Sequence, residues 1–428
     1  MKRLLLLLLV LLTVTFACNE DDDPIDPNTD SPNILLIIAD DLGKDALSGF
    51  SEGSIKPSTP NIDAIRNDGL SFTNMWVYPT CTPTRASIIT GKYGYRTDVK
   101  WAGDELSQSE KALQRYIDEE TNNAYSTAII GKWHLSGENT GLNPESFGID
   151  HYAGLIRGSV QNYYQWQLTE DGSGTMQTEY ITEVLTDLSI DWVNSQSEPW
   201  FLWLAYNAPH TPFHAPPTEM HSQGDLPTYE DGFDPMPYYM AAIEAMDFQI
   251  GRLLESLPTE ERENTVVLFI GDNGTPNQVA QSPYDRNSAK GTLYQGGVNV
   301  PFFVSGKGVS RTGEDGSLMS STDLFSTIAE LAGVSVSEIN DSKSFASLLS
   351  SATSHRNFQY SEMDNGTDDL WTISNGTYKL IVNANGDEEM YHLVSDPYED
   401  NDLLLGALST NEENAKAELE AELLQIRN

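Results

Sequence analysis

The chain has 428 residues, which allows one large domain or two to three smaller ones, and 39% of them are hydrophobic, enough for a substantial core. Its 24 Lys and Arg residues are outnumbered by 64 Asp and Glu residues, giving a formal net charge of −40. This charge argues against a general attraction to nucleic acid or anionic membranes, so an anionic target needs a local positive cluster.

The first 17 residues have the pattern of a signal peptide. Lys2 and Arg3 precede an apolar run, Leu4–Leu12, that is too short to span a membrane comfortably. The following TVTFAC resembles a relaxed bacterial lipobox, which predicts cleavage before Cys18 and lipidation of Cys18. Ordinary secretory cleavage is the alternative. We expect an exported lipoprotein of the bacterial envelope, at the outer membrane surface or in the periplasm, that contacts the membrane through this lipid only.

Residues 18–32 are predicted to form a disordered tether, because they are acidic, contain three prolines and include one large apolar residue, Ile25. Cysteine occurs twice in the chain, at Cys18 and Cys81. If Cys18 is lipidated, Cys81 has no partner for an intramolecular disulfide. Cys81 is then a buried inert thiol, half of an intermolecular bridge, or a residue kept for its chemistry.

The region 33–350 alternates apolar runs with helical patterns and is predicted to be one α/β catalytic domain. Its large central sheet should be mostly parallel with helices on both faces, because the runs are nearly continuous in apolar residues. A helix is expected between Thr59 and Gly69, and an amphipathic helix over 238–257. The predicted strands are NILLIIAD (33–40), AYSTAIIGKWH (124–134), PWFLWLAYNAPH (199–210), NTVVLFIGDNG (264–274) and VPFFVSG (300–306).

The pattern changes after Ser350. Short strand-like segments in 358–396 are separated by turn signals such as Asn375-Gly376, which predicts a small antiparallel sheet. The final residues, 411–428, are predicted to form a closing helix. We therefore assign 351–428 to a C-terminal subdomain.

Four of the apolar runs end in residues suited to chemistry, and ligands of open α/β sheets bind at the carboxyl ends of strands. The residues with oxygen ligands are Asp40, Asp41, Asp272 and Asn273. This set suits a hard divalent cation, Ca²⁺ or Mg²⁺. Each pair taken alone is better explained as a helix cap or a turn.

Positive or protonatable groups accompany these oxygens. They are Arg85, Lys132, His134, His210 and Lys290. Such a set suits a tetrahedral oxyanion, a phosphate or sulfate ester. Taken singly, Lys290 is also explained as a surface charge and His210 as a hydrogen-bonded core residue.

These residues resemble the conserved blocks of the sulfatase family. CTPTR at Cys81–Arg85 fits the signature Cys-x-Pro-x-Arg, and ASIITGKYGYR resembles its continuation. IIADDLG, GKWHL, APHTPFHAP, FIGDNGT, KGTLYQGGVNVP and MYHLVSDPYEDNDL resemble the other blocks in order. The resemblance runs from Asn33 to Leu404 and implies an alkaline phosphatase-like fold. With the signal peptide, the chain resembles polysaccharide sulfatases of Bacteroidetes.

The resemblance also implies a modification. In this family the matching cysteine is oxidised to formylglycine by a maturing enzyme, which would be a partner of the chain. One hydroxyl of the hydrated aldehyde attacks sulfur, the alcohol leaves, and the second hydroxyl loses its proton as sulfate is expelled. Cys81 would be this residue, with Arg85 holding its hydroxyl.

The remaining roles follow residue by residue from the same resemblance. The implied metal is Ca²⁺ rather than Mg²⁺, and its implied ligands are Asp40, Asp41, Cys81 as formylglycine, Asp272 and Asn273. Lys132 and Lys290 match residues that bind sulfate oxygens. Lys290, His210 or both would stabilise or protonate the leaving oxygen. His134 would be the base for elimination.

The expected substrate is a sulfated carbohydrate. The candidate sugar contacts are Trp101, Trp133, Arg157, His214 and Arg286. Each lies in or near a motif loop, and each is also explained by packing or surface charge.

Gly94 and Asn299 depart from a proline and an arginine that are usual in the family. The rival functions are a phosphonate or phosphate ester hydrolase of the same superfamily and a non-catalytic glycan-binding lipoprotein. The oligomeric state is left open.

Overall fold

The computed structural model describes residues 31–137 and 142–428. The predicted signal peptide, lipidated Cys18 and most of the tether lie outside the described residues. Among the described residues, no helix has the length and apolar character needed to cross a membrane.

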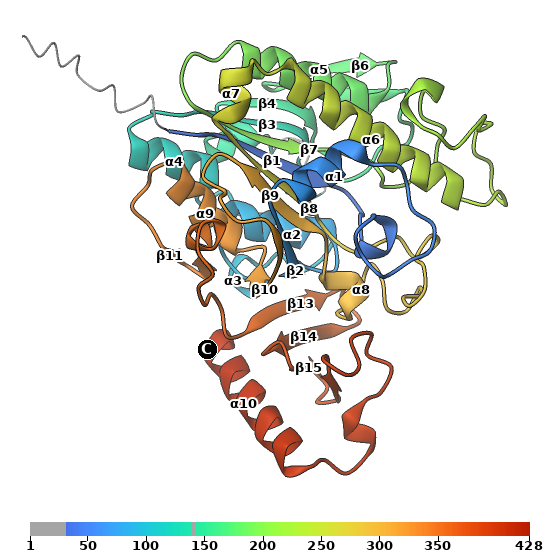
Figure 1. The fold of residues 1–428 in the computed structure, drawn as a ribbon, viewed down its shortest axis with the longest axis vertical. Helices are drawn as coiled ribbons and strands as arrows, with labels where there is room; N and C mark the ends of the chain where they lie inside the picture. Colours follow the sequence, from blue (N-terminus) through green and yellow to red (C-terminus); the bar gives the residue numbers. More distant parts are fainter. Residues whose placement is uncertain (1–30, 138–141) are drawn as a thin grey trace, which may run out of the picture.

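A ten-stranded mixed sheet forms the centre of the molecule (Figure 1). From one edge to the other its strands are β10 (Gly313–Ser320), β2 (Leu70–Trp76), β9 (Phe302–Gly306), β8 (Thr265–Gly271), β1 (Asn33–Ala39), β7 (Trp200–Ala205), β3 (Ser126–Lys132), β4 (His151–Leu155), β5 (Trp166–Glu170) and β6 (Ser173–Gln177). Strands β8, β1, β7, β3 and β4 are parallel neighbours, whereas β9, β5 and β6 run antiparallel to their neighbours.

Both faces of the sheet are buried under helices, which explains the continuous apolar runs. Ile34, Leu36 and Ile38 of β1 pack in one core cluster with side chains of α2 (Cys81–Thr90), α4 (Leu113–Thr121) and α9 (Asp323–Leu331). The alternate residues of β1 pack in a second cluster with α1 (Pro60–Asn67), α5 (Ile181–Asn194) and α6 (Met236–Ser256). The predicted α/β architecture is confirmed.

The shorter elements connect this framework. They are α3 (Gly94–Thr97), α7 (Thr259–Glu263), α8 (Gln295–Val298), β11 (Glu338–Ile339) and β12 (Ser342–Lys343). The helix expected after Thr59 is present, but the Thr59 side chain makes no capping hydrogen bond and the helix ends at Asn67, before Gly69.

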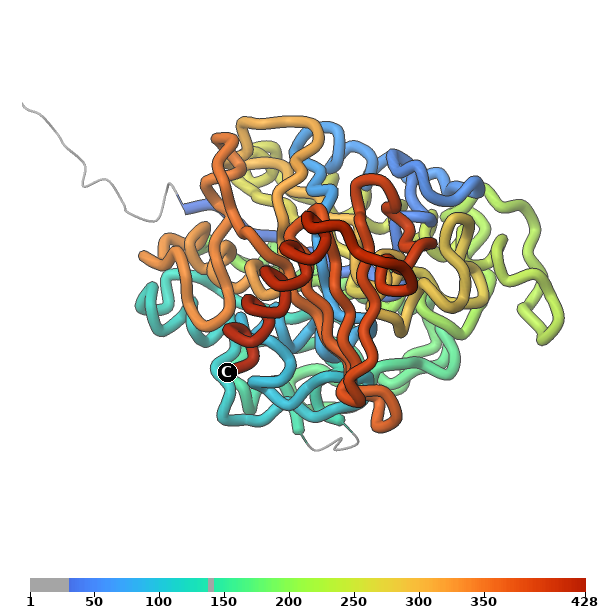
Figure 2. The backbone as a smooth tube through the Cα atoms, turned by 90° about the horizontal axis from the view of Figure 1, so that it is seen from below, coloured from blue at the N-terminus to red at the C-terminus, as the bar shows by residue number. Residues whose placement is uncertain are grey.

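The C-terminal segment forms a second, four-stranded antiparallel sheet. Its strands are β13 (Gln359–Asp364), β14 (Asp369–Ser374), β15 (Tyr378–Asn383) and β16 (Glu388–His392). Helix α10 (Thr410–Arg427) lies across this sheet, as Figure 2 shows, and buries Leu419 and Leu423 against it. The predicted sheet and closing helix are confirmed, while the domain limits at 33–350 and 351–428 stay a prediction.

Candidate active site

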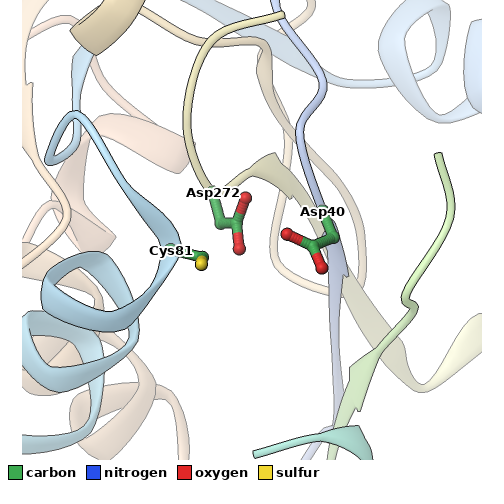
Figure 3. Close-up of side chains that lie close together, drawn as sticks. All are labelled: Asp40, Cys81 and Asp272. Carbon is green, nitrogen blue, oxygen red and sulfur yellow. The ribbon is translucent and has the colours of Figure 1, made fainter. Parts of the chain in front are cut away.

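The candidate site lies at the edge of the sheet where the central parallel strands end. Asp40 follows β1 and Asp272 follows β8, and the register Ala39↔Gly271 places the two carboxylates side by side. Figure 3 shows Asp40, Asp272 and Cys81 turned toward one common space. Possible ligand atoms of these three side chains lie within 4.8 Å of one another, as do those of Asp40, Asp41 and His210.

The oxygens at this edge fit a hard cation. Asp40 Oδ1 and Asn273 Oδ1 are buried and have no hydrogen-bond partner among the described residues. Unpaired buried oxygens are costly unless a cation, a water molecule or another polar group satisfies them. Asp41 has a backbone φ of 71°, in the left-handed region. A residue other than glycine is strained there, and such strain is often found at functional sites. Carboxylate and amide oxygens together are ligands of the Ca²⁺ and Mg²⁺ type.

Cys81 is the first residue of α2 and is 2% exposed. Thr80 before it is extended, and Pro83 is tolerated because a first-turn residue needs no backbone N–H bond. The helix N-terminus favours negative charge at this position. Cys81 Sγ lies 3.1 Å from His134 Nδ1, and Thr82 Oγ1 lies 3.3 Å from the same nitrogen.

Arg85 follows Cys81 by one helical turn, so its side chain emerges on the same face of α2. Its Nε and Nη2 donate to Asp272 Oδ2 at 3.1 and 2.7 Å, and its Nη1 donates to the Lys132 carbonyl at 2.8 Å. The side chain is fully buried. Arg85 therefore joins the nucleophile position, one candidate metal ligand and the end of β3.

Two lysines lie beside the carboxylates. Lys132 Nζ donates to Asp40 Oδ2 at 2.5 Å and is fully buried. Lys290 Nζ contacts Asp41 Oδ1 and is partly exposed. Burial alone would raise the pKa of Asp41, but Lys290, His210 and Lys132 outweigh it and hold that pKa far below its usual range. Cationic nitrogens thus surround the space that the carboxylates enclose.

The two histidines differ in exposure. Burial, together with the positive charges of Lys132 and Arg85, holds the pKa of His134 well below its ordinary value. A neutral His134 can accept a proton. His210 is partly exposed at the mouth of the site, with Nε2 3.7 Å from Asp41 Oδ2. Its Nδ1 donates to the Thr211 carbonyl at 2.6 Å, which leaves Nε2 facing the site.

The predicted sugar contacts have different fates. Trp133 is 2% exposed, donates to Ser136 Oγ and lies tilted against Phe147, with ring centroids 5.3 Å apart, so its ring packs in the core and this burial argues against the predicted sugar contact. His214 stacks on Tyr163 at 3.6 Å, and burial lowers its pKa to about 4, so it is neutral and packed.

The other three predicted contacts are accessible. Trp101 is half-buried beside Gly291, the neighbour of Lys290. Arg157 and Arg286 are exposed, and neither makes an ion pair within the described residues. Their contact with sugar stays a prediction.

Several supporting residues were not predicted. Tyr163 Oη donates to the carbonyls of Asn207 and His210 at 2.7 and 2.6 Å and so fixes the loop that carries His210. Tyr239 Oη donates to the Asp41 carbonyl at 2.8 Å. Thr82 and Asn207 lie within motifs already identified and could have been found from them. Tyr163 and Tyr239 give no signal in the sequence, because they reach the site from distant elements.

The two departures from the family pattern are accommodated locally. Gly94 begins α3, and its N–H donates to Tyr78 Oη at 2.9 Å. Asn299 Oδ1 accepts from the buried Lys44 Nζ at 2.7 Å. Neither residue contacts the side chains of the candidate site by any hydrogen bond or ion pair within the described residues.

A buried nucleophile position, an oxygen-rich cation site and several cationic groups define a hydrolase of anionic esters. The family model Sulfatase matches residues 32–334, and the chain belongs to the sulfatase family. It is a sulfuric ester hydrolase.

Two related sequences and one solved structure illustrate the similarity. The uncharacterized sulfatase YdeN of Escherichia coli (strain K12) is 28% identical over 384 residues, covering 76% of this chain and 67% of its own. An arylsulfatase of Klebsiella aerogenes is 26% identical over 408 residues, covering 71% of this chain and 87% of its own. The structure of Ps i-CgsB in complex with k-i-k-neocarrahexaose matches 92% of both chains with 25% identity and a TM-score of 0.78.

Proposed function

We propose that the protein hydrolyses sulfate esters of carbohydrates, with a formylglycine made from Cys81 and a bound Ca²⁺. The observation that carries this proposal is the position of Cys81 at the start of α2, where it points at the carboxylates and lies 3.1 Å from His134. A cysteine that serves only as a packed thiol does not need to face carboxylates and a histidine. The carbohydrate is supported by the neocarrahexaose bound to the similar protein Ps i-CgsB.

Ca²⁺ would supply charge and formylglycine the nucleophile. Bound Ca²⁺ supplies positive charge that stabilises oxyanions, and Asp40, Asp41, Asp272 and Asn273 are the residues that would hold it. Formylglycine, as its hydrate, supplies one hydroxyl to attack sulfur and a second whose proton is lost when sulfate leaves.

The side chains of the chain bind the ester and move its protons. Lys132 and Lys290 hold sulfate oxygens by charge-assisted hydrogen bonds, and Arg85 fixes the nucleophile by its link to Asp272. His210 presents Nε2 to the leaving oxygen and, with a proton on Nε2 as well as on Nδ1, donates the Nε2 proton as the alcohol departs. His134 stays neutral because its pKa is low, so Nδ1 can accept the proton of the second hydroxyl.

Peptide mass spectrometry of protein from its native host tests the nucleophile. Conversion of Cys81 to formylglycine should lower the mass of its peptide by about 18 Da. The same sample should release sulfate from sulfated saccharides, and a Cys81→Ala variant should not. An active protein in which Cys81 remains a thiol would contradict the proposed chemistry. Cleavage of a phosphate diester without cleavage of the matching sulfate ester would favour the rival hydrolase instead.

Metal removal tests the cation. Dialysis against a chelator should abolish sulfate release and lower the melting temperature, because buried carboxylates then lose their counter-charge. Added Ca²⁺ should restore both, with Mg²⁺ less effective because the site supplies several protein oxygens. An Asp272→Asn variant should bind Ca²⁺ more weakly in a direct titration. Full activity after chelation would overturn the assignment.

We also propose that the mature protein is anchored in the bacterial envelope by a lipid on Cys18. The support is the lipobox-like TVTFAC followed by an acidic segment. In the native host, the wild-type protein should sediment with membranes and release from them only with detergent. A Cys18→Ala variant should be processed differently and lose this attachment.

A further inference from the structure

A pocket of about 620 Å³, lined by both polar and apolar side chains, lies beside the candidate active site on the side of β4 and β5. Strand β4 pairs in parallel with β3, and the register Lys132↔Leu155 brings the ends of both strands to the same edge. The pocket begins at this point, because its wall includes Leu155 and Arg157. It is therefore an extension of the edge at which the sulfate ester is cleaved.

His134 forms the link between pocket and site. Its backbone N–H donates to the Ile156 carbonyl at 3.1 Å. Its imidazole packs so closely on Gly158 that a Cβ added there would lie 2.0 Å from Nε2. The segment 156–158 thus covers the ring of the proposed base on one side and carries Arg157 into the pocket on the other.

The chemistry of the pocket suits a charged sugar. Arg157 is exposed and makes no ion pair or hydrogen bond with its side chain among the described residues, in a chain whose net charge is −40. Gln161, Gln165 and Gln167 add amide donors and acceptors that suit sugar hydroxyls. Met176 is 63% exposed and offers an apolar surface to the C–H face of a ring.

We propose that this pocket, the Arg157 pocket, binds the sugar unit next to the one whose sulfate is cleaved, and that Arg157 recognises a second oxyanion on that unit. The inference rests on the proposed carbohydrate sulfatase function and adds the substrate class: an oligosaccharide with an anionic group, sulfate or carboxylate, on the adjoining sugar. A guanidinium presents two parallel N–H donors that match either oxyanion.

The lack of a side-chain partner for Arg157 among residues 31–137 and 142–428 supports this role. Other surface arginines of this acidic protein have a carboxylate partner, as Arg96 and Arg115 do. Because no carboxylate of the described residues neutralises this guanidinium, its charge is available to an anionic ligand beside the candidate active site. It also supplies a local attraction that the negative charge of the whole molecule opposes.

The test compares Arg157→Gln with the wild-type enzyme on matched substrates. The substrates are hexasaccharides of sulfated galactans and glycosaminoglycans that carry one cleavable sulfate, with a sulfate, a carboxylate or no charge on the adjoining sugar, together with p-nitrophenyl sulfate. The variant should lose about 10- to 100-fold in kcat/KM, mainly through KM, on the doubly charged hexasaccharides. Arg157→Lys should lose less.

Controls separate this role from catalysis. Hydrolysis of p-nitrophenyl sulfate, which is too small to reach the pocket, should change less than about twofold in Arg157→Gln. Arg262 is exposed and lies in α7, which precedes β8 at the end of the strand opposite the candidate site. The variant Arg262→Gln should therefore match the wild type on every substrate. The sulfate and carboxylate arms identify the oxyanion that Arg157 prefers.

A binding measurement keeps the inference independent of turnover. In a Cys81→Ser background, calorimetric titration should show weaker binding of the doubly charged hexasaccharide when Arg157→Gln is added. Equal binding by both proteins, or an equal loss on p-nitrophenyl sulfate, would overturn the inference. Absence of sulfate release by a formylglycine-containing wild-type protein, with hexasaccharide binding still sensitive to Arg157, would instead refute the sulfatase proposal alone.

Discussion

His210 keeps one orientation because its Nδ1 donates to the Thr211 carbonyl and its loop is tied down by Tyr163. Proton transfer from Nε2 matters most when the leaving alcohol is a poor leaving group. His210→Ala should therefore lower kcat on a sulfated saccharide by about 100-fold or more, and on p-nitrophenyl sulfate by less than about tenfold. Steady-state assays on both substrates measure this difference.

His392→Ala provides the control for His210, because His392 lies on β16 of the small sheet, away from the central strand ends. It should match the wild type on both substrates. An equal loss on both substrates in His210→Ala would show that His210 only binds sulfate or supports the loop. The expected role of His210 as proton donor would then pass to Lys290.

Gly158 leaves room for the His134 ring, because a Cβ at this position would lie 2.0 Å from His134 Nε2. Gly158→Ala should displace this ring from Cys81 and lower kcat by about 10- to 100-fold on all substrates, including p-nitrophenyl sulfate. The melting temperature should change little, since the ring is the movable end of a side chain. Kinetics and thermal unfolding together check this result.

A matched glycine variant completes the experiment on Gly158. Gly316→Ala on β10 should leave kcat unchanged, because the added Cβ would meet only Thr73 Oγ1, at 3.9 Å. Peptide mass spectrometry should show the same formylglycine content at Cys81 in both variants. Normal turnover by Gly158→Ala would mean that His134 tolerates displacement and is not the base for elimination.

At the scale of elements, five contiguous parallel strands explain why the site residues meet. β8, β1, β7, β3 and β4 end at one edge, so residues that are distant in sequence arrive within a few ångströms of each other. Helix α2 then begins at this edge and aims its positive end at the same space. Stability and chemistry are linked here, because the apolar strands that build the core also fix the site.

Helix α4 carries a buried carboxylate, Asp118, in its C-terminal half. Burial, with the neighbouring Asp150 and Glu119, raises the pKa of Asp118 to about 7, and Asp118 Oδ1 has no hydrogen-bond partner among the described residues. The unfolded chain releases this proton near pH 4, but the folded chain holds it to about pH 7. Between these values the folded state binds more protons, so stability should fall as the pH rises.

The variant Asp118→Asn tests this pH dependence. It should unfold at a melting temperature about 1–3 °C above wild type at pH 8, where screened charge on Asp118 costs the fold about 1 kcal/mol. The difference should vanish below about pH 4, where Asp118 is protonated in both states. Asp150→Asn should give a smaller gain at pH 8. A melting difference that is independent of pH would indicate a packing effect instead.

At the scale of the whole molecule, the sequence predicted the central sheet and the small C-terminal sheet because their apolar runs and turn signals are strong. The sequence also predicted that Asp40, Asp41, Asp272 and Asn273 lie together, because parallel strands end at a shared edge of the sheet. The burial of Trp133 argues against its predicted sugar contact, because successive side chains of an extended chain alternate in direction and Lys132 takes the face toward the site.

The hairpin of β5 and β6 was not predicted at all. Its strands are short and largely polar, and β6 is almost entirely exposed, so no apolar periodicity marks it. This hairpin supplies Met176 and Gln167 to the Arg157 pocket. In the proposed assignment, substrate specificity is therefore determined by the part of the fold with the weakest sequence pattern, whereas the candidate catalytic groups follow the strongest.

The net charge of −40 predicts an unusual response of the enzyme to salt. A sulfated oligosaccharide is repelled at long range, while Lys290 and Arg157 attract it only at contact. Raising the ionic strength from about 0.01 to 0.15 M shortens the Debye length from about 30 to 8 Å, which screens the distant repulsion first. The value of kcat/KM on a multiply sulfated hexasaccharide should therefore rise about 3- to 10-fold over this range.

At about 1 M salt the Debye length falls to about 3 Å, so the contacts themselves weaken and kcat/KM should decline again. Singly charged p-nitrophenyl sulfate should show a much flatter profile, because the repulsion scales with the charge of the substrate. Steady-state assays across a NaCl series, repeated with KCl, measure both curves. A continuous fall of kcat/KM from the lowest salt would mean that the local cations at the strand ends dominate the approach of the substrate, in spite of the acidic surface.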